Sequence, residues 1–258
     1  MSEAASARKS DLGVRVIGGI AMIAVALTCL WLGGLAFWAL TAAAAMLMLQ
    51  EWAGLMRVGR GWLPLLVFAV PLLYASPLIG GVDRNAVALV ITGAMLVALS
   101  GSARLGAGLL YAGLPALSLL YLRELPQGMA LALWTLAVIW ATDIGAYFAG
   151  RAIGGAKLAP AISPNKTWAG LIGGVFAAAV IGALIVFALD LPSKLAPLGG
   201  AMAVLAQIGD LYESWLKRRA GVKDSGRLLP GHGGVLDRLD GLVPVAVLVT
   251  ALHASGWL

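Results

Sequence analysis

The residues of this chain that could do chemistry gather in two polar stretches, 140–168 and 207–240. Six of the twelve acidic residues lie there, among lysines, arginines and glycine-rich turns. Phosphoryl or nucleotidyl transfer needs this mixture, because carboxylates can hold a metal ion and cationic side chains can neutralise phosphates. The two stretches therefore predict an enzyme that handles a nucleoside triphosphate. Their acidic residues are Asp143, Asp210, Glu213, Asp224, Asp237 and Asp240.

The second stretch carries the more specific pattern. Asp237 and Asp240, spaced i, i+3, follow a loop with three glycines around His232 and could bind a hard divalent cation such as Mg²⁺. Two simpler interpretations stay open. The aspartates could form an acidic helix start with Arg238 as ion partner, and His232 could be a loop histidine held by the backbone. Upstream, a predicted helical face carries Asp210, either Glu213 or Ser214, and Lys217.

In the first stretch, Asp143 interrupts an apolar run, where a carboxylate costs about 2.5–3.5 kcal/mol on insertion scales unless it faces a polar cavity or a partner. Asp143, Tyr147 and Arg151 would share one helical face. An internal pair that only holds helices together is the alternative. The other acidic residues of the chain sit mostly at tails and loop positions, and we assign them no special role.

Pro160 and Pro164 predict that the segment after this helix is not helical. Its free backbone N–H groups, hydroxyls and lysines, next to the start of another apolar run, could cradle a phosphate. An ordinary basic cytoplasmic loop is an equally good interpretation. The residues concerned are Gly154, Gly155, Lys157, Ser163, Lys166 and Thr167.

The composition defines the elements that must position these residues. Hydrophobic residues make up 61% of the 258 residues and charged residues 12%, about half the share of roughly 25% expected for a soluble domain. A soluble domain and a disordered chain are excluded, and we predict an all-α, polytopic membrane protein. Nine apolar runs are candidate spans: 12–30, 34–56, 62–79, 85–99, 105–120, 129–149, 168–189, 195–209 and 241–258. We divide the chain into N-terminal spans (1–125) and a C-terminal catalytic region (126–258).

The distribution of basic residues predicts the orientation. With nine spans and a cytoplasmic N-terminus, 15 of the 18 lysines and arginines face the cytoplasm, and only Arg84, Arg123 and Lys194 face outward. This bias follows the positive-inside rule and places the C-terminus in the periplasm. It also explains the net charge of +6 without a nucleic-acid partner. Gly170 and Gly174, four residues apart, predict close helix packing, either within the chain or at a dimer seam.

Several of these residues also form a recognisable pattern. The segments SWLKR (214–218), KDSG (223–226), LPGHGG (229–234) and DRLD (237–240) resemble the signature of phosphatidate cytidylyltransferases. The upstream segments beginning at Trp140 (W-x-x-D-x-x-A-Y-F-x-G-R) and Ser163 (S-P-x-K-T-W) are similar to that family as well. One position departs from the family, which often has glutamate where this chain has Ala169.

The resemblance implies a membrane enzyme that makes CDP-diacylglycerol and pyrophosphate from CTP and phosphatidic acid. It implies Mg²⁺, with K⁺ beside it, a homodimer, and an active site on the cytoplasmic face of the inner membrane. The implied metal ligands are Asp210 and Asp237, with Asp143 a further candidate. Lys166, Lys217, Arg218, Lys223 and Arg238 would handle phosphates, and Asp143, Asp224, His232 and Asp240 complete the catalytic set. Substrate would contact Lys157, Ser163, Asn165, Thr167, Ser214, Gly233 and Gly234.

Two alternatives remain at this stage. A CTP-dependent lipid kinase acting on a polyprenol-type alcohol would use a similar nucleotide site. An ion-coupled transporter would use Asp143 as its intramembrane carboxylate, but such a protein is expected to place its polar residues near the middle of the bilayer rather than at one face.

Overall fold

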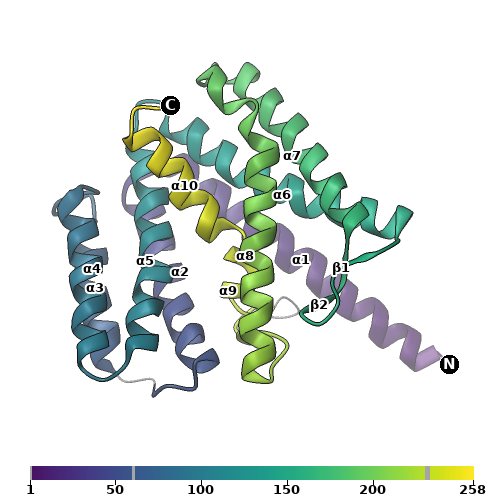
Figure 1. The fold of residues 1–258 in the computed structure, drawn as a ribbon, viewed down its shortest axis with the longest axis horizontal. Helices are drawn as coiled ribbons and strands as arrows, with labels where there is room; N and C mark the ends of the chain where they lie inside the picture. The colour runs from purple at the N-terminus through teal and green to yellow at the C-terminus, as the bar shows by residue number, and fades with distance from the viewer. Residues whose placement is uncertain (1, 60–61, 230–232) are drawn as a thin grey trace.

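The computed structural model describes residues 2–59, 62–229 and 233–258, and most of them are helical. Helix α8 runs through the middle of the molecule, with α2 to α5 on one side; α6 passes behind α8 toward the other side, where its last turns lie with the hairpin end of α7 (Figure 1). The helices are α1 (Ser2–Leu32), α2 (Gly34–Leu55), α3 (Trp62–Tyr74), α4 (Arg84–Leu99), α5 (Ala103–Glu124), α6 (Gly128–Ile153), α7 (Trp168–Ala188), α8 (Leu198–Ala220), α9 (Leu236–Leu239) and α10 (Leu242–Ala254), with a 3₁₀ turn, η1 (Ser193–Leu195).

Each of the nine apolar runs forms a helix, which confirms the helical reading. Four helices, α2, α5, α6 and α7, are long and apolar enough to cross a membrane. Residues 17–32 of α1 and helices α3, α4 and α10 are apolar but shorter. The 13 residues of α3 or α10 make a helix about 20 Å long, less than a hydrocarbon core of about 30 Å. Large apolar side chains such as Phe176 (71% exposed) cover the outer surface, as expected of a lipid-facing protein.

The segment between α6 and α7 corrects the all-α expectation. It lies outside any helix, as its prolines predicted, but it forms an antiparallel hairpin of β1 (Lys157–Ala159) and β2 (Ser163–Thr167). The hairpin leads directly into α7, whose first turn is capped by the Thr167 hydroxyl. That hydroxyl accepts a hydrogen bond from the Gly170 N–H at 3.0 Å. The hairpin is thereby placed against the same end of the molecule as the last turns of α6.

Glycines let α6 and α7 pack closely. A Cβ added at Gly174 would lie 2.8 Å from the Thr142 carbonyl oxygen, and one at Gly145 would lie 2.7 Å from the Gly173 carbonyl oxygen. Both approaches are closer than a side chain tolerates, so the helices can meet only because these positions lack Cβ atoms. Gly170 and Gly174 therefore pack within the chain.

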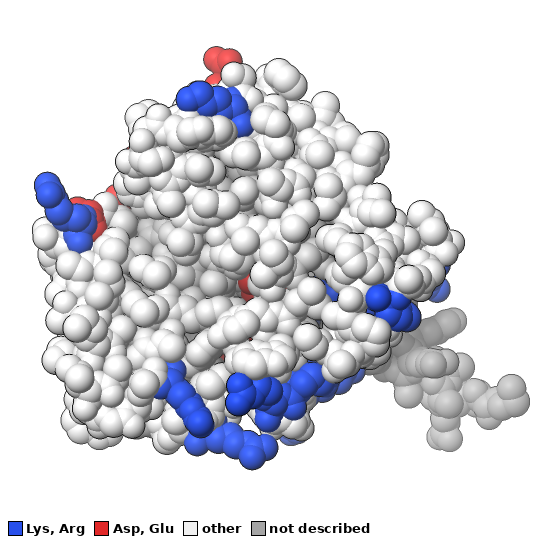
Figure 2. All heavy atoms as spheres, in the orientation of Figure 1, with Lys and Arg blue, Asp and Glu red and all other residues white. Residues whose placement is uncertain are grey.

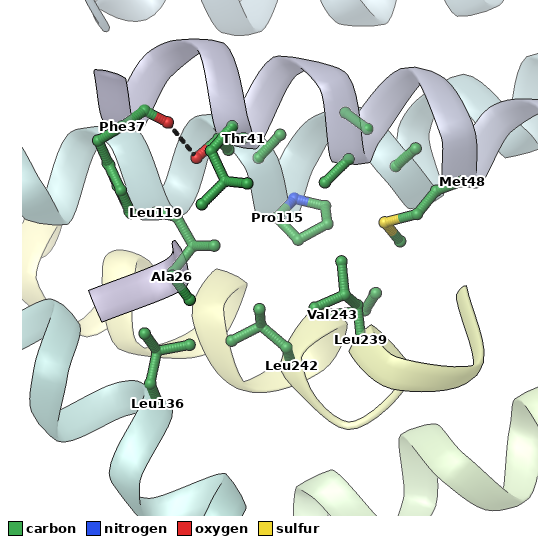
Figure 3. A pocket seen from close by; sticks show the side chains of 15 residues that line it. Ala26, Phe37, Thr41, Met48, Pro115, Leu119, Leu136, Leu239, Leu242 and Val243 are labelled. Carbon is green, nitrogen blue, oxygen red and sulfur yellow. Dashed lines mark hydrogen bonds between the residues drawn. The ribbon is translucent and has the colours of Figure 1, made fainter. Parts of the chain in front are cut away.

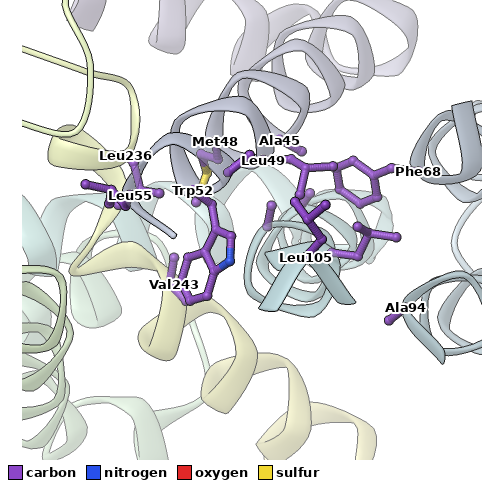
Figure 4. Packing of buried hydrophobic residues seen from close by; sticks show 14 of the residues in the cluster. Ala45, Met48, Leu49, Trp52, Leu55, Phe68, Ala94, Leu105, Leu236 and Val243 are labelled. Carbon is purple, nitrogen blue, oxygen red and sulfur yellow. The ribbon is translucent and has the colours of Figure 1, made fainter. Parts of the chain in front are cut away.

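A buried apolar cluster joins α2 to the end of the chain. Trp52 and Leu55 of α2 belong to one cluster with Leu236 of α9 and Val243 of α10 (Figure 4). The Trp52 indole N–H also donates to the carbonyl oxygen of Arg104, at the start of α5, at 2.8 Å. This cluster places the C-terminal end of α2 beside the segment that carries Asp237 and Asp240.

Candidate active site

The hairpin is tied to α8 by charged side chains of the two polar stretches. The Lys166 ammonium in β2 lies 2.5 Å from Asp210 Oδ2 and donates to Gln207 Oε1 at 2.9 Å. Asp210 Oδ1 in turn accepts from the Ser214 hydroxyl at 3.2 Å. Arg218, two turns further along α8, donates to the carbonyl oxygen of Ile162 at 3.2 Å. The two polar stretches, which are separate in sequence, therefore lie against each other in the fold.

A second ion-pair group lies further along α8. The Lys217 ammonium donates to Asp237 Oδ1 at 2.7 Å and lies 2.5 Å from Glu213 Oε2, whose side chain is fully buried. Asp237 Oδ2 accepts two more hydrogen bonds, from the Ser225 N–H at 2.9 Å and from the Gly234 N–H at 2.7 Å, and the Ser225 hydroxyl oxygen lies 2.9 Å from it. Asp237 thus holds two residues that precede α9, Ser225 and Gly234, through their backbone N–H groups.

These contacts keep Lys217 and Asp237 ionised at neutral pH. Burial alone would raise the pKa of Asp237, but the hydrogen bonds from Lys217 and from two backbone N–H groups outweigh it and hold the pKa below 3.8. Burial alone would lower the pKa of Lys217, but hydrogen bonds to Asp237 and Glu213 hold it above 10.5. Because the Lys217–Asp237 salt bridge has little exposure to water, water screens it poorly and the two charges attract each other strongly.

Three carboxylates, of which Asp143 is exposed and Asp210 and Asp240 are half-buried, form an acidic cluster. Electrostatic interactions couple Asp143 of α6 with Asp210 of α8, and both with Asp240, while Lys166 and Arg238 oppose the repulsion at Asp143. Burial, together with the charge of Asp210, raises the pKa of Asp240 to about 7. Asp143 and Asp210 each lie ten residues from the last residue of their helix, about 15 Å along the axis. Acidic atoms are visible in a recess near the centre of this face (Figure 2).

This acidic cluster fits a hard divalent cation by its chemistry, because carboxylate oxygens are ligands that Mg²⁺ prefers. Over residues 2–59, 62–229 and 233–258, however, no three carboxylate, histidine or cysteine side chains converge as a ready-made metal site. Asp210 and Asp237 are held by different lysines, and both oxygens of Asp237 already accept hydrogen bonds. The predicted ligand set of Asp210, Asp237 and Asp143 therefore stays a prediction.

The remaining predicted site residues divide by exposure. Thr167 is 5% exposed and caps α7, so its hydroxyl is already engaged in the fold. Lys157, Asn165, Arg218, Lys223, Asp224 and Arg238 are exposed at the surface, and Ser163 is half-buried. Gly233 has a left-handed φ of 82°, and a Cβ there would lie 2.7 Å from Asp237 Oδ2. His232 lies outside the described residues.

The sequence reading missed Glu51. We had assigned no role to the acidic residues outside the two polar stretches, and the structure shows that this was wrong. Glu51, near the end of α2, is 8% exposed and accepts hydrogen bonds from the Ser225 hydroxyl and from the N–H groups of Val235 and Leu236. Its position inside an apolar run was the available signal, by the same cost argument that drew attention to Asp143.

An apolar cavity of about 110 Å³ lies near the acidic cluster, between α1, α2, α5, α6 and the α9–α10 segment (Figure 3). Leu239 and Leu242, which flank Asp240 in sequence, line it together with Phe37 and Met48. Its one lining hydroxyl, on Thr41, donates to the Phe37 carbonyl oxygen at 2.8 Å. Such a lining suits hydrocarbon and offers a nucleotide no polar partner.

The chain is similar to known proteins over most of its length. A model described as the cytidylyltransferase family matches residues 13–255, which include both polar stretches. The phosphatidate cytidylyltransferase of Brucella suis is 44% identical over 262 aligned residues, covering 93% of this chain and 92% of that protein. The protein of the same name from Pseudomonas aeruginosa is 44% identical over 160 residues, 60% of this chain and 59% of its own. That of Staphylococcus aureus is 43% identical over 129 residues, 49% and 50% of the two chains.

Proposed function

The chain belongs to the cytidylyltransferase family, and from that premise we propose that it transfers the cytidylyl group of CTP to phosphatidate, which gives CDP-diacylglycerol and pyrophosphate. One structural observation carries the proposal. Two lysines, Lys166 and Lys217, pair with Asp210 and Glu213 of α8, next to an acidic cluster and an apolar cavity. The lysines suit two substrates that both carry several negative charges, and the apolar cavity suits the one that is a lipid.

The reaction requires charge neutralisation more than acid–base catalysis. A phosphate oxygen of phosphatidate attacks the α-phosphorus of CTP, and a new P–O bond forms. The bond from that phosphorus to the oxygen bridging the β-phosphate breaks, and pyrophosphate leaves with the electron pair. Because the phosphate monoester is already an anion at neutral pH, it needs no general base. The groups that offset the charge are Lys166, Lys217, Arg218, Lys223 and Arg238.

The hairpin and the glycine-rich loop provide the remaining groups for substrate. Lys157, Ser163 and Asn165 lie on the hairpin, and Ser214 faces Asp210 on α8. Asp224, His232, Gly233 and Gly234 belong to the loop between α8 and α9. The apolar cavity beside Leu239 would receive part of an acyl chain while the lipid phosphate stays at the charged groups.

We propose Mg²⁺ as the cofactor, with K⁺ beside it. Asp210 is its first candidate ligand, and Asp143 and Asp240 are coupled to Asp210 electrostatically. Asp237 could join only if Lys217 moved away from Oδ1. When bound, Mg²⁺ would neutralise phosphate oxygens and stabilise the leaving pyrophosphate.

We propose nine spans in the inner membrane, with the active site and N-terminus cytoplasmic and the C-terminus periplasmic. Support comes from the distribution of charge. Lysines and arginines gather along the lower edge of the molecule in Figure 2, below α8, whereas the C-terminus lies at the upper end in Figure 1. A homodimer is part of the same proposal, and it rests on the family resemblance alone.

The position of the radioactive label tests the reaction. Purified protein is incubated in detergent with phosphatidate, Mg²⁺ and CTP labelled with ³²P at either the α or the γ position. We expect α label in the lipid product and γ label in pyrophosphate. A lipid kinase would put γ label into an alcohol lipid and release CDP. γ label in the lipid would overturn the proposed reaction.

A further inference from the structure

Glu51 has no role in the reaction described above, yet it makes several contacts with the segment that carries Asp237. Its carboxylate accepts from the Val235 N–H on Oε1 at 2.9 Å, and on Oε2 from the Leu236 N–H at 2.8 Å and the Ser225 hydroxyl at 2.9 Å. The partners lie 174 to 185 residues further along the chain. Burying a carboxylate costs free energy unless hydrogen bonds compensate for the lost water. The groups that donate to Glu51 therefore indicate which part of the structure it stabilises.

The first effect of Glu51 is to cap α9. The N-cap of α9 is Val235, which has no side-chain oxygen and makes no capping hydrogen bond. The first N–H groups of a helix have no intrahelical partner, and a carboxylate at that end stabilises them. Glu51 supplies from α2 what Val235 cannot. The capped turn carries Asp237 and Arg238, and Asp240 follows it.

The second effect is to shape the glycine-rich loop. A Cβ added at Gly226 would overlap Glu51 alone, and its three nearest atoms would be Oε1, Cδ at 2.8 Å and Cγ at 3.2 Å. A Cβ at Gly234 would overlap both Glu51 and the Ser225 hydroxyl. Neither glycine has a left-handed φ. Close approach to Glu51 therefore explains why glycine suits positions 226 and 234, which both pack directly against the carboxylate.

Ser225 connects Glu51 to the ion-pair group of the site. Its hydroxyl lies 2.9 Å from Glu51 Oε2 and 2.9 Å from Asp237 Oδ2, while its N–H donates to the same Asp237 oxygen. Asp237 Oδ1 binds Lys217. The contacts thus run without a break from Glu51 through Ser225 and Asp237 to Lys217.

From these contacts we infer that Glu51 is a positioning residue for the cytidylyl transfer. It holds Ser225, Val235 and the first turn of α9 so that Asp237 and Arg238 keep their places, and it does not itself touch substrate. The inference rests on the proposed function for its kinetic consequence. Its structural part, the ordering of the loop, can be measured whatever reaction the protein catalyses.

The primary test is Glu51→Gln, with Glu124→Gln as the matched control. Glu124 is an exposed glutamate at the end of α5 that accepts one long hydrogen bond, from Val82 N–H at 3.5 Å. Gln keeps the size of Glu51 but must turn an NH₂ group toward at least one of the three donors. We expect kcat to fall at least about tenfold while KM for phosphatidate changes less than about twofold. Glu124→Gln should leave both unchanged.

Hydrogen–deuterium exchange of the full-length protein in detergent gives a readout independent of activity. In Glu51→Gln, peptides covering 225–239 should exchange faster, while peptides of α6 and α7 keep the wild-type rate. Faster exchange across all helices would show a general loss of stability and would overturn the positioning role. So would exchange in 225–239 no faster than in Glu124→Gln. A wild-type protein that makes no CDP-diacylglycerol would instead contradict the proposed function.

A double-mutant cycle tests the contact itself. Gly226→Ala should impair the wild-type protein, because the added Cβ overlaps the Glu51 side chain. Glu51→Ala removes the three atoms nearest to this Cβ, so Gly226→Ala should add little in that background. Loop exchange and kcat should both show this coupling. Equal effects of Gly226→Ala in the two backgrounds would refute the packing on which the inference depends.

Discussion

Replacing Lys217 by Met tests the electrostatics of the site most directly. The side chain of Lys217 is 12% exposed and lies between the Glu213 carboxylate, 0% exposed, and the Asp237 carboxylate, 4% exposed. Methionine keeps the length and the apolar stem but removes the charge. Two buried carboxylates then face each other without a cation, and Glu213 already has an oxygen with no hydrogen-bond partner in the described part of the chain.

The magnitude follows from the burial of the pair. Removing one partner of a buried ion pair costs about 3–5 kcal/mol, because it leaves an uncompensated charge in a medium of low polarity. For a chain of this size each kcal/mol shifts Tm by roughly 2–4 °C. Lys217→Met should therefore lower Tm by roughly 6–20 °C and abolish cytidylyl transfer.

Thermal unfolding in detergent, followed by tryptophan fluorescence at neutral pH, measures this shift. The matched control is Lys157→Met, since Lys157 is exposed on the hairpin and a surface change costs about 0.5 kcal/mol or less. Because burial raises the pKa of Glu213 to about 8, Glu213 is a stranded charge only above that pH; at about pH 9, adding Glu213→Gln to Lys217→Met should recover at least about 3 °C. A Tm for Lys217→Met no lower than that of Lys157→Met would refute the reasoning, as would a double variant less stable than the single one.

The remaining predictions concern the metal, the phosphates and the topology. Asp237→Asn should abolish CDP-diacylglycerol formation with the protein still inserted, and activity within about threefold of wild type at saturating Mg²⁺ would remove Asp237 from the ligand set. Because folding lowers the pKa of Asp237, its contribution to stability is complete above pH 3.8 and is lost as pH falls below that value, so Tm should fall more steeply with acid in wild type than in Asp237→Asn. Lys223→Ala, at an exposed position, should slow the reaction without changing Tm or the α-label pattern. A reporter fused after Leu258 should be periplasmic and one in the 217–238 loop cytoplasmic, and a cytoplasmic C-terminus would mean an even number of spans.

The sequence alone determined the helices and the two chemical stretches. Apolar runs are local, so all nine could be read directly, and Pro160 and Pro164 excluded helix from the segment between α6 and α7 for equally local reasons. The signature from Ser214 to Asp240 indicated the family for the same reason, because its residues are close in sequence. What hydropathy could not show was that the excluded segment pairs with itself as a hairpin.

Only the tertiary structure decided which charged groups meet. Residue types predicted lysines beside carboxylates, but the pairing of Lys166 with Asp210 and of Lys217 with Asp237 depends on where the hairpin and the loop pack against α8. The Thr167 cap of α7 is the opposite case, because Thr167 contacts Gly170 only three residues further along the chain and the sequence alone specifies such a cap. Glu51 is the clearest case. Its partners lie at least 174 residues away, and no local pattern specifies them, because a contact over that distance is set by the packing of α2 against α9 and α10 rather than by sequence spacing.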